Sequence, residues 1–135
     1  MALWILTLKG RRNDYPDDKP CKGYNTMALH HVKPGEIVHL RPLGPALKDT
    51  ATTAIIKSDR FEAMRLIVHA GVEIPSHEVP GNITLHCLEG AVELGLKDAA
   101  VQLSAGDWIY LDGGEAHSVK GLEDSALLLT IIFNN

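Results

Sequence analysis

The sequence predicts an all-β fold, a single double-sheet barrel of the jelly-roll type. From residue 27 onward, short apolar or alternating segments are separated by turn signals, a pattern typical of barrels and sandwiches. No segment carries the apolar period of a helix of ordinary length. The chain of 135 residues, 45% of them hydrophobic, is long enough to bury the core of one such domain.

Residues 1–26 differ from the rest and are expected to form a poorly ordered N-terminal extension. Residues 10–25 are rich in charge, Pro and Gly and show no apolar period. The apolar run at residues 1–8 is too short to span a bilayer, and its positive charges follow it instead of preceding it as in a signal peptide. We therefore expect the barrel domain at residues 27–135 and no targeting or membrane segment.

Turn signals delimit each expected strand of the barrel. The pair Pro34-Gly35 separates the first two strands, and Pro42 and Pro45 break the chain before one helical turn at residues 46–50. The last strand is a continuous apolar run, which indicates that both of its faces are covered. The expected strands are residues 28–32, 36–40, 53–57, 61–70, 83–88, 91–97, 101–103, 108–111, 116–120 and 126–133.

Composition and motif content exclude several functional classes. The net charge is −4 and the basic residues are scattered, so no face for nucleic acid is expected. Two cysteines, Cys21 and Cys87, are too few for a disulfide framework, which favours a reducing, cytoplasmic compartment. The sequence contains no Gly-rich phosphate loop before a helix, no H-E-x-x-H zinc motif and no serine in a nucleophile elbow.

Two segments carry a regular spacing of glycine and histidine. The first, GVEIPSHEVPGNITLHCLEG, spans residues 71–90, and the second, GDWIYLDGGEAH, spans residues 106–117. Glycines at strand ends permit turn angles that other residues avoid. In their spacing the two segments resemble the two-part motif of the cupin superfamily of small β-barrels. The fuller run is similar to that of small, single-domain, RmlC-like bacterial cupins. The resemblance covers residues 27–135 and implies a jelly-roll barrel with an interior pocket.

The resemblance also implies a metal centre with four ligands, which are the two histidines of an H-x-H pair, a glutamate and a later histidine. His77 and His117 stand at two of these positions, whereas Val79 and Ile83 stand at the other two and cannot bind a metal. Imidazole suits Zn, Fe, Mn, Ni or Cu, but a catalytic zinc site normally keeps three protein ligands. The alternative is that both histidines are hydrogen-bonded polar groups that bind an organic ligand or water.

The register of one strand decides whether a third metal ligand is available. With Ile83 facing inward, Leu85 and Cys87 share its face and His86 points outward. A shift of one residue turns His86 inward, where it becomes a candidate third ligand beside His77. Both registers are compatible with the sequence.

Three functions are compatible with this site. The first is a module that binds a small molecule, with or without a divalent metal. The second is a metal-dependent enzyme, of the dioxygenase, isomerase or decarboxylase type, that uses the two histidines. The third is a regulatory or scaffolding dimer with a vestigial pocket. For the first function, the expected pocket lining is His77, Val79, Ile83, Leu85 and His117.

The remaining expectations concern partners and structural side chains. Cupin-like domains commonly dimerise, so the resemblance implies a homodimer, with residues 28–40 as the candidate contact. Trp108 and Tyr110 alternate with apolar neighbours and are expected outside the barrel at a subunit contact. Cys87 is expected to be a small buried apolar residue, and Glu89 to be exposed beside a turn glycine.

Overall fold

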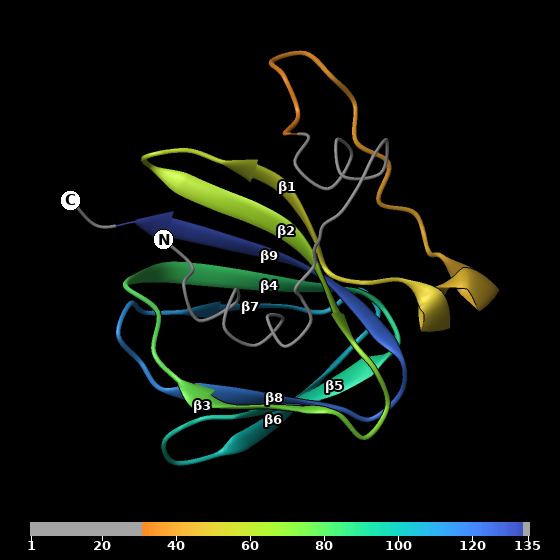
Figure 1. Ribbon diagram of the computed structural model, residues 1–135. Helices are drawn as coiled ribbons and strands as arrows, with labels where there is room; N and C mark the ends of the chain where they lie inside the picture. Colours follow the sequence, from red (N-terminus) through yellow and green to blue (C-terminus); the bar gives the residue numbers. More distant parts are fainter. Residues whose placement is uncertain (1–30, 134–135) are drawn as a thin grey trace, which may run out of the picture.

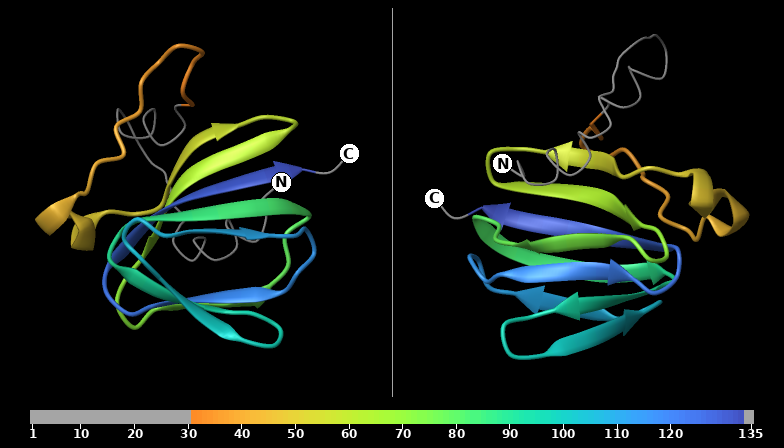
Figure 2. Two further views of the ribbon diagram at one scale, coloured as in Figure 1. Left: turned by 180° about the vertical axis from the view of Figure 1, so that it is seen from behind. Right: turned by 60° about the horizontal axis from the view of Figure 1, so that its bottom comes forward.

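Two antiparallel β-sheets face each other in the computed structural model, which describes residues 31–133 (Figure 1). The larger sheet has the strand order β1-β2-β9-β4-β7 and the smaller one β3-β8-β5-β6 (Figure 2). The predicted all-β jelly-roll fold is thereby confirmed, while the N-terminal extension at residues 1–26 lies outside the described residues. The strands are β1 (Thr53–Lys57), β2 (Phe61–Val68), β3 (Glu73–His77), β4 (Gly81–Glu89), β5 (Ala91–Gly95), β6 (Ala100–Ser104), β7 (Trp108–Leu111), β8 (His117–Gly121) and β9 (Ser125–Phe133).

The core lies between the two sheets and follows the alternation of the strands. In β4, the side chains of Ile83, Leu85 and Cys87 are buried. The register pairs these positions with buried residues of β9, from Ile131 back to Leu127. Full burial of a Leu or Ile side chain stabilises the fold by about 1.5–3 kcal/mol. A slip of one residue would expose the whole apolar set, so packing fixes this register.

Most predicted strands form; the strand expected at residues 28–32 lies mostly outside the described residues and is not formed at residues 31–32, and two further differences have local causes. Strand β3 was not predicted, because its short sequence EIPSH contains a proline and only one buried apolar residue, Ile74. Residues 36–40 were predicted as a strand but form an extended arm after the turn at residues 34–35. The side chain of Ile37 in this arm is 76% exposed. The alternating apolar residues are therefore not buried there and do not stabilise a strand.

The arm at residues 31–43 is tied to the larger sheet by a few specific hydrogen bonds. The backbone N–H of Val32 donates to the carbonyl of Ile55 over 2.9 Å, and the Arg65 guanidinium donates to the carbonyl of His39 over 2.6 Å. The arm leads into the 3₁₀ helix η3 (Gly44–Asp49), close to the predicted helical turn. Within residues 31–133, no helix is long and apolar enough to cross a membrane.

Glu89 anchors the junction between the arm and η3. Its two carboxylate oxygens accept the backbone N–H groups of Leu43, over 2.8 Å, and Gly44, over 2.9 Å. The expectation that Glu89 is exposed is wrong, since the side chain is half-buried by this contact.

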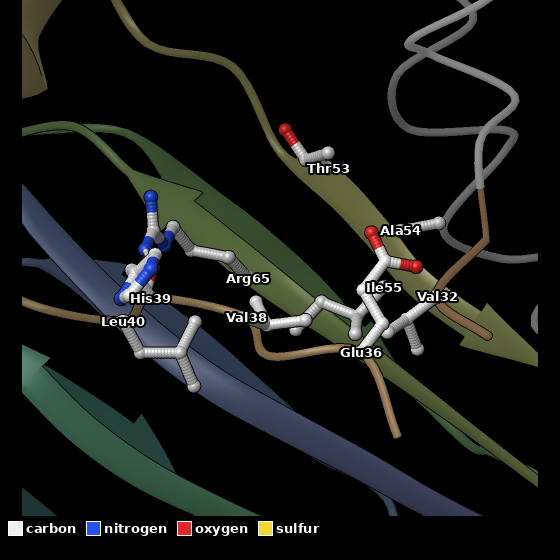
Figure 3. A pocket seen from close by; sticks show the side chains of 9 residues that line it. All are labelled: Val32, Glu36, Val38, His39, Leu40, Thr53, Ala54, Ile55 and Arg65. Carbon is white, nitrogen blue, oxygen red and sulfur yellow. Dashed lines mark hydrogen bonds between the residues drawn. The ribbon is translucent and has the colours of Figure 1, made fainter. Parts of the chain in front are cut away.

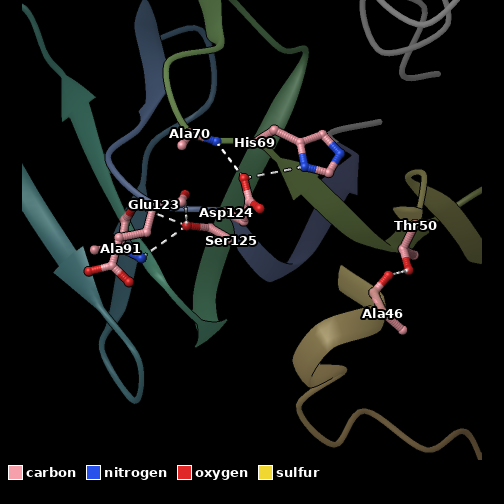
Figure 4. A network of polar contacts seen from close by, with 8 residues as sticks. All are labelled: Ala46, Thr50, His69, Ala70, Ala91, Glu123, Asp124 and Ser125. Atoms are coloured by element: carbon pink, nitrogen blue, oxygen red, sulfur yellow. Dashed lines mark hydrogen bonds and ion pairs between the residues drawn. The ribbon is translucent and has the colours of Figure 1, made fainter. Parts of the chain in front are cut away.

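One end of the sandwich is closed by polar contacts between its strand ends (Figure 4). The buried Ser125 hydroxyl bonds both backbone groups of Ala91 over 2.9 Å. The Asp124 carboxylate accepts the backbone N–H of Ala70 over 2.9 Å and lies 3.5 Å from Nδ1 of His69. Gly121 also exchanges backbone hydrogen bonds with the Gly71 turn. The two motif histidines lie at the opposite end of these strands.

Candidate functional site

The structure brings the two motif histidines together. His77 ends β3, His117 begins β8, and the two residues are directly paired across the strands. Their ring centroids lie 4.5 Å apart with an angle of 60° between the ring planes. A register irregularity between Ile74 and His77 locally breaks the alternation of β3. His117 is 3% exposed, and His77 is half-buried.

Both imidazole rings are oriented by the same contact, a hydrogen bond from Nδ1 to the backbone carbonyl two residues earlier. Nδ1 of His77 donates to the carbonyl of Pro75 over 2.7 Å, and Nδ1 of His117 donates to the carbonyl of Glu115 over 2.9 Å. A carbonyl oxygen can only accept, so each Nδ1 carries the proton and the neutral ring has its lone pair on Nε2. The Nε2 atom of His77 is buried. A fixed tautomer with a directed Nε2 is the arrangement of a histidine that accepts a hydrogen bond or binds a metal.

The surroundings of His77 favour its neutral form. Burial lowers the pKa of His77 below the ordinary value of 6.5, and the nearby His117 ring acts in the same direction. The hydrogen bond to Pro75 opposes this shift but does not outweigh it. At neutral pH, His77 is therefore a hydrogen-bond acceptor at Nε2 and not a cation.

Apolar residues fill the positions that would complete a four-ligand centre. Val79 and Ile83 are each 2% exposed and belong to the hydrophobic core. The backbone carbonyl of Val79 also accepts the N–H of Gly114 over 3.1 Å, which connects the two motif segments. Leu85 is buried one inward position further along β4, opposite Leu129. The side chains of Val79, Ile83 and Leu85 thus form an apolar wall and offer no metal ligand.

His86 does not join the histidine pair. The unshifted register holds, because Ile83, Leu85 and Cys87 face the core and His86 lies on the other face of β4. There its cross-strand neighbours are Trp108 on β7 and Leu128 on β9. Trp108 is 59% exposed on this outer face, so the aromatic side chains of β7 lie outside the barrel as expected.

The described residues do not fit a tightly held catalytic metal ion. Between residues 31 and 133, no three His, Cys, Asp or Glu side chains are arranged to hold one ion. His77 and His117 provide two imidazole donors, one short of the usual minimum for a catalytic zinc site. Because Val79 and Ile83 add no donor, we derive no chemical step through a metal.

One buried polar residue of the barrel interior was missed by the sequence reasoning. Glu62 is 6% exposed and lies on the inward face of β2 with Met64, Leu66 and Val68. Its signal was available in the alternation of the segment FEAMRLIV, which places the acid on the apolar face. Glu62 stands next to the start of its strand, where an acidic side chain is ordinarily solvated. The local sequence therefore does not distinguish it from a surface residue.

A hollow lies on the outside of the larger sheet, between the arm and strands β1 and β2 (Figure 3). It has a volume of about 240 Å³. Its lining is largely apolar, with Val38 and Ile55 among the residues, and Arg65 and His39 lie at one end. The Arg65 guanidinium bonds the His39 carbonyl and thereby holds the arm in place. This hollow is separate from the histidine pair, which faces the barrel interior.

Comparisons with known proteins agree with this architecture. The family described as a cupin domain matches residues 64–133, more than half of the chain. No curated protein matches. The chain is 19% identical to a cupin superfamily protein from Desulfitobacterium hafniense, over 73% of this chain and 95% of that one, with a TM-score of 0.63.

Two further solved structures share the fold. SPY1581, a conserved protein of unknown function from Streptococcus pyogenes, is 19% identical over 73% of this chain and 92% of that one, with a TM-score of 0.62. An RmlC-like cupin protein from Desulfovibrio desulfuricans is 23% identical over 71% of this chain and 95% of that one, with a TM-score of 0.60. The matched motif segments and the two facing sheets lead to one conclusion: the chain belongs to the cupin family.

Proposed function

We propose that this protein binds a small organic molecule between its two sheets, at the end of the barrel that carries His77 and His117. The observation that carries the proposal is the shared constraint on the two rings. Each Nδ1–H is bound by a backbone carbonyl, so each Nε2 is directed as an acceptor. Two acceptors beside an apolar wall provide orientation and burial, the two properties of a small-molecule site.

The apolar residues at the remaining motif positions favour an organic ligand over a metal-dependent reaction. Val79 and Ile83 occupy positions where a metal centre needs donors, and they are packed into the core. Apolar surface at these positions instead contributes about 25 cal/mol for each Å² of ligand that it removes from water. The neutral state of His77 supports the same proposal, because a cationic ring could not accept a hydrogen bond.

The test is a small-molecule screen by thermal shift, followed by calorimetric titration of the hits on three proteins: wild type, His117→Gln and His86→Gln. A ligand at 100 times its Kd stabilises the folded state by about 2.7 kcal/mol, which a thermal shift detects. We expect His117→Gln to weaken binding about tenfold, or ~1.4 kcal/mol, through loss of one directed acceptor. His86→Gln, on the outer face, is the matched control and should bind as wild type does.

Two outcomes would overturn the proposal. Hits that bind wild type and His117→Gln equally well would place the ligand elsewhere, with the hollow beside Arg65 as the first alternative. Elemental analysis of untagged protein provides the other check. Near-stoichiometric metal that disappears in a His77→Ala/His117→Ala variant would favour the metal-dependent enzyme instead.

A further inference from the structure

We propose that Glu62 is a ligand-binding carboxylate of this site and that the ligand carries a protonated amine. The inference rests on the proposed function and specifies the chemistry of the ligand. It is based on the placement of Glu62, on its buried Oε1 atom without a hydrogen-bond partner and on the acceptor character of the two histidines.

Glu62 faces the interior at the same end of the barrel as the histidine pair. Its neighbours at alternate positions of β2 are core residues, so its side chain points between the sheets. The register aligns Glu62 with Ile131 of β9, and Ile131 with Ile83 of β4. Strands β4 and β8 begin, and β3 ends, at this end of the barrel, which places the histidines on the facing sheet (Figure 1).

The carboxylate of Glu62 is buried without a hydrogen-bond partner for its Oε1 atom. A buried polar atom that lacks a hydrogen-bond partner destabilises a fold more than an apolar group of similar size would. Lys57 lies opposite Glu62 in the register, but it is exposed, and Oε1 remains without a hydrogen bond. A purely structural role does not account for such a group, whereas a ligand that supplies a donor does.

The distance between Glu62 and the histidine pair determines how long the ligand must be. Facing sheets lie about 10 Å apart, and no three acidic, His or Cys side chains of residues 31–133 can share one ion. A single metal ion therefore does not bridge Glu62 and the histidine pair in this geometry. A molecule long enough to reach both sheets can do so.

The chemistry of the ligand follows from the polar groups that it would meet. A carboxylate only accepts hydrogen bonds, and an imidazole ring whose single proton is on Nδ1, bound to a backbone carbonyl as in His77 and His117, accepts at Nε2. The ligand must therefore supply the donors. A protonated amine supplies three N–H groups, and a hydrogen bond from a cationic donor to a carboxyl oxygen is stronger than one from a neutral donor.

The test compares ligands that differ only in their end groups. Titrations use 1,4-diaminobutane, 4-amino-1-butanol and 1,4-butanediol, followed by calorimetry and by amide chemical-shift changes in the NMR spectrum. We expect the two amines to bind and the diol to bind at least tenfold more weakly. Glu62→Gln should reduce amine affinity at least tenfold, whereas Glu93→Gln, which removes an exposed carboxylate of β5, should not.

A second variant separates a ligand-binding role from a structural one. Glu62→Leu replaces the carboxyl group, whose Oε1 atom has no hydrogen-bond partner, by an apolar side chain of similar size. If Glu62 serves the ligand, this variant should lose amine binding and unfold several degrees higher than wild type, because a buried polar atom without a hydrogen-bond partner has been removed. A lower unfolding temperature would show that Glu62 supports the fold and would overturn the inference.

The outcomes also distinguish this inference from the proposed function. Failure of the amines to bind wild type, or equal affinity of diol and amine, overturns the inference about Glu62. In either case, hits from the screen that depend on His117 but not on Glu62 would leave the proposed function intact. Hits that depend on neither residue would overturn both.

Discussion

Gly90 illustrates how one residue holds the closed end of the barrel. It forms the turn between β4 and β5 with a φ of 86°, in the left-handed region that favours glycine. A Cβ at this position would meet the backbone carbonyl of Asp124, next to the buried hydroxyl of Ser125. The turn therefore needs a glycine for two reasons, the backbone angle and the close approach of a neighbouring chain segment.

Gly90→Ala should lower the free energy of unfolding by about 2–5 kcal/mol. The left-handed conformation costs a non-glycine residue about 1–2 kcal/mol, and overpacking against a fixed backbone adds about 1–3 kcal/mol. Gly106→Ala is the matched control, because Gly106 has a φ of 96° but open space around its Cβ position. Urea denaturation measures both variants. Equal losses would show that no steric conflict exists at Gly90.

At the scale of elements, the arm and η3 differ from the sheets in what holds them. Strands β4 and β9 are paired residue by residue from Gly81 to Cys87, and the inward side chains of this ladder are buried. The arm depends on isolated bonds, above all the two that Glu89 accepts from Leu43 and Gly44. A segment with few buried apolar contacts opens locally at a lower free energy than the core.

Glu89→Ala should release this junction while leaving the barrel folded. The two lost hydrogen bonds to a charged acceptor are each worth about 1.5–3 kcal/mol. Amide hydrogen exchange, measured by NMR, should therefore accelerate strongly at Leu43 and Gly44 and little in β4. Glu93→Ala, at an exposed site on β5, is the control. Unchanged exchange at Leu43 and Gly44 would mean that Glu89 does not anchor the arm.

The difference between buried strands and the exposed arm also explains which elements the sequence could predict. Strands such as β1 and β7 form at the predicted residues, because local alternation and turn signals decide them. For β4 the sequence left two registers open, and packing of Ile83, Leu85 and Cys87 in the core selects the unshifted one. Residues 36–40 alternate in the same way, but Ile37 finds no surface to cover it, so the pattern alone gives no strand.

For the candidate site, sequence reasoning reached what the motif spacing encodes and missed what tertiary contact decides. It predicted that His77 and His117 belong to one site, and the structure places their rings in contact. It did not find Glu62, whose burial depends on β9 and on the facing sheet. It misplaced Glu89, whose partners lie 45 and 46 residues away in the chain. Contacts of that separation leave no local periodic signal.

At the scale of the whole molecule, the environment of His77 couples folding to pH. Its pKa lies below 6.5 in the folded protein, mainly because burial disfavours the charged ring. Well above pH 6.5 the ring is neutral in both the folded and the unfolded state, so it does not change the free energy of unfolding. As the pH falls from 6.5 toward the folded-state pKa, the unfolded chain binds a proton that the folded protein resists, so stability decreases.

The prediction is a decline in the free energy of unfolding below pH 6.5 that a His77→Gln variant reduces. One proton contributes at most ~1.4 kcal/mol per pH unit, and the contribution of a half-buried ring is smaller because solvent screens it. Urea denaturation at several pH values between 5 and 8 (a range of about three units around the ordinary histidine pKa) measures it. His39→Gln, at an exposed position of the arm, controls for loss of any histidine. If His77→Gln and wild type lose stability in parallel, the proton uptake belongs to other groups. If only the wild-type curve is steep, acid destabilises this barrel through the same ring that is proposed to bind its ligand, and ligand affinity should fall over the same pH range.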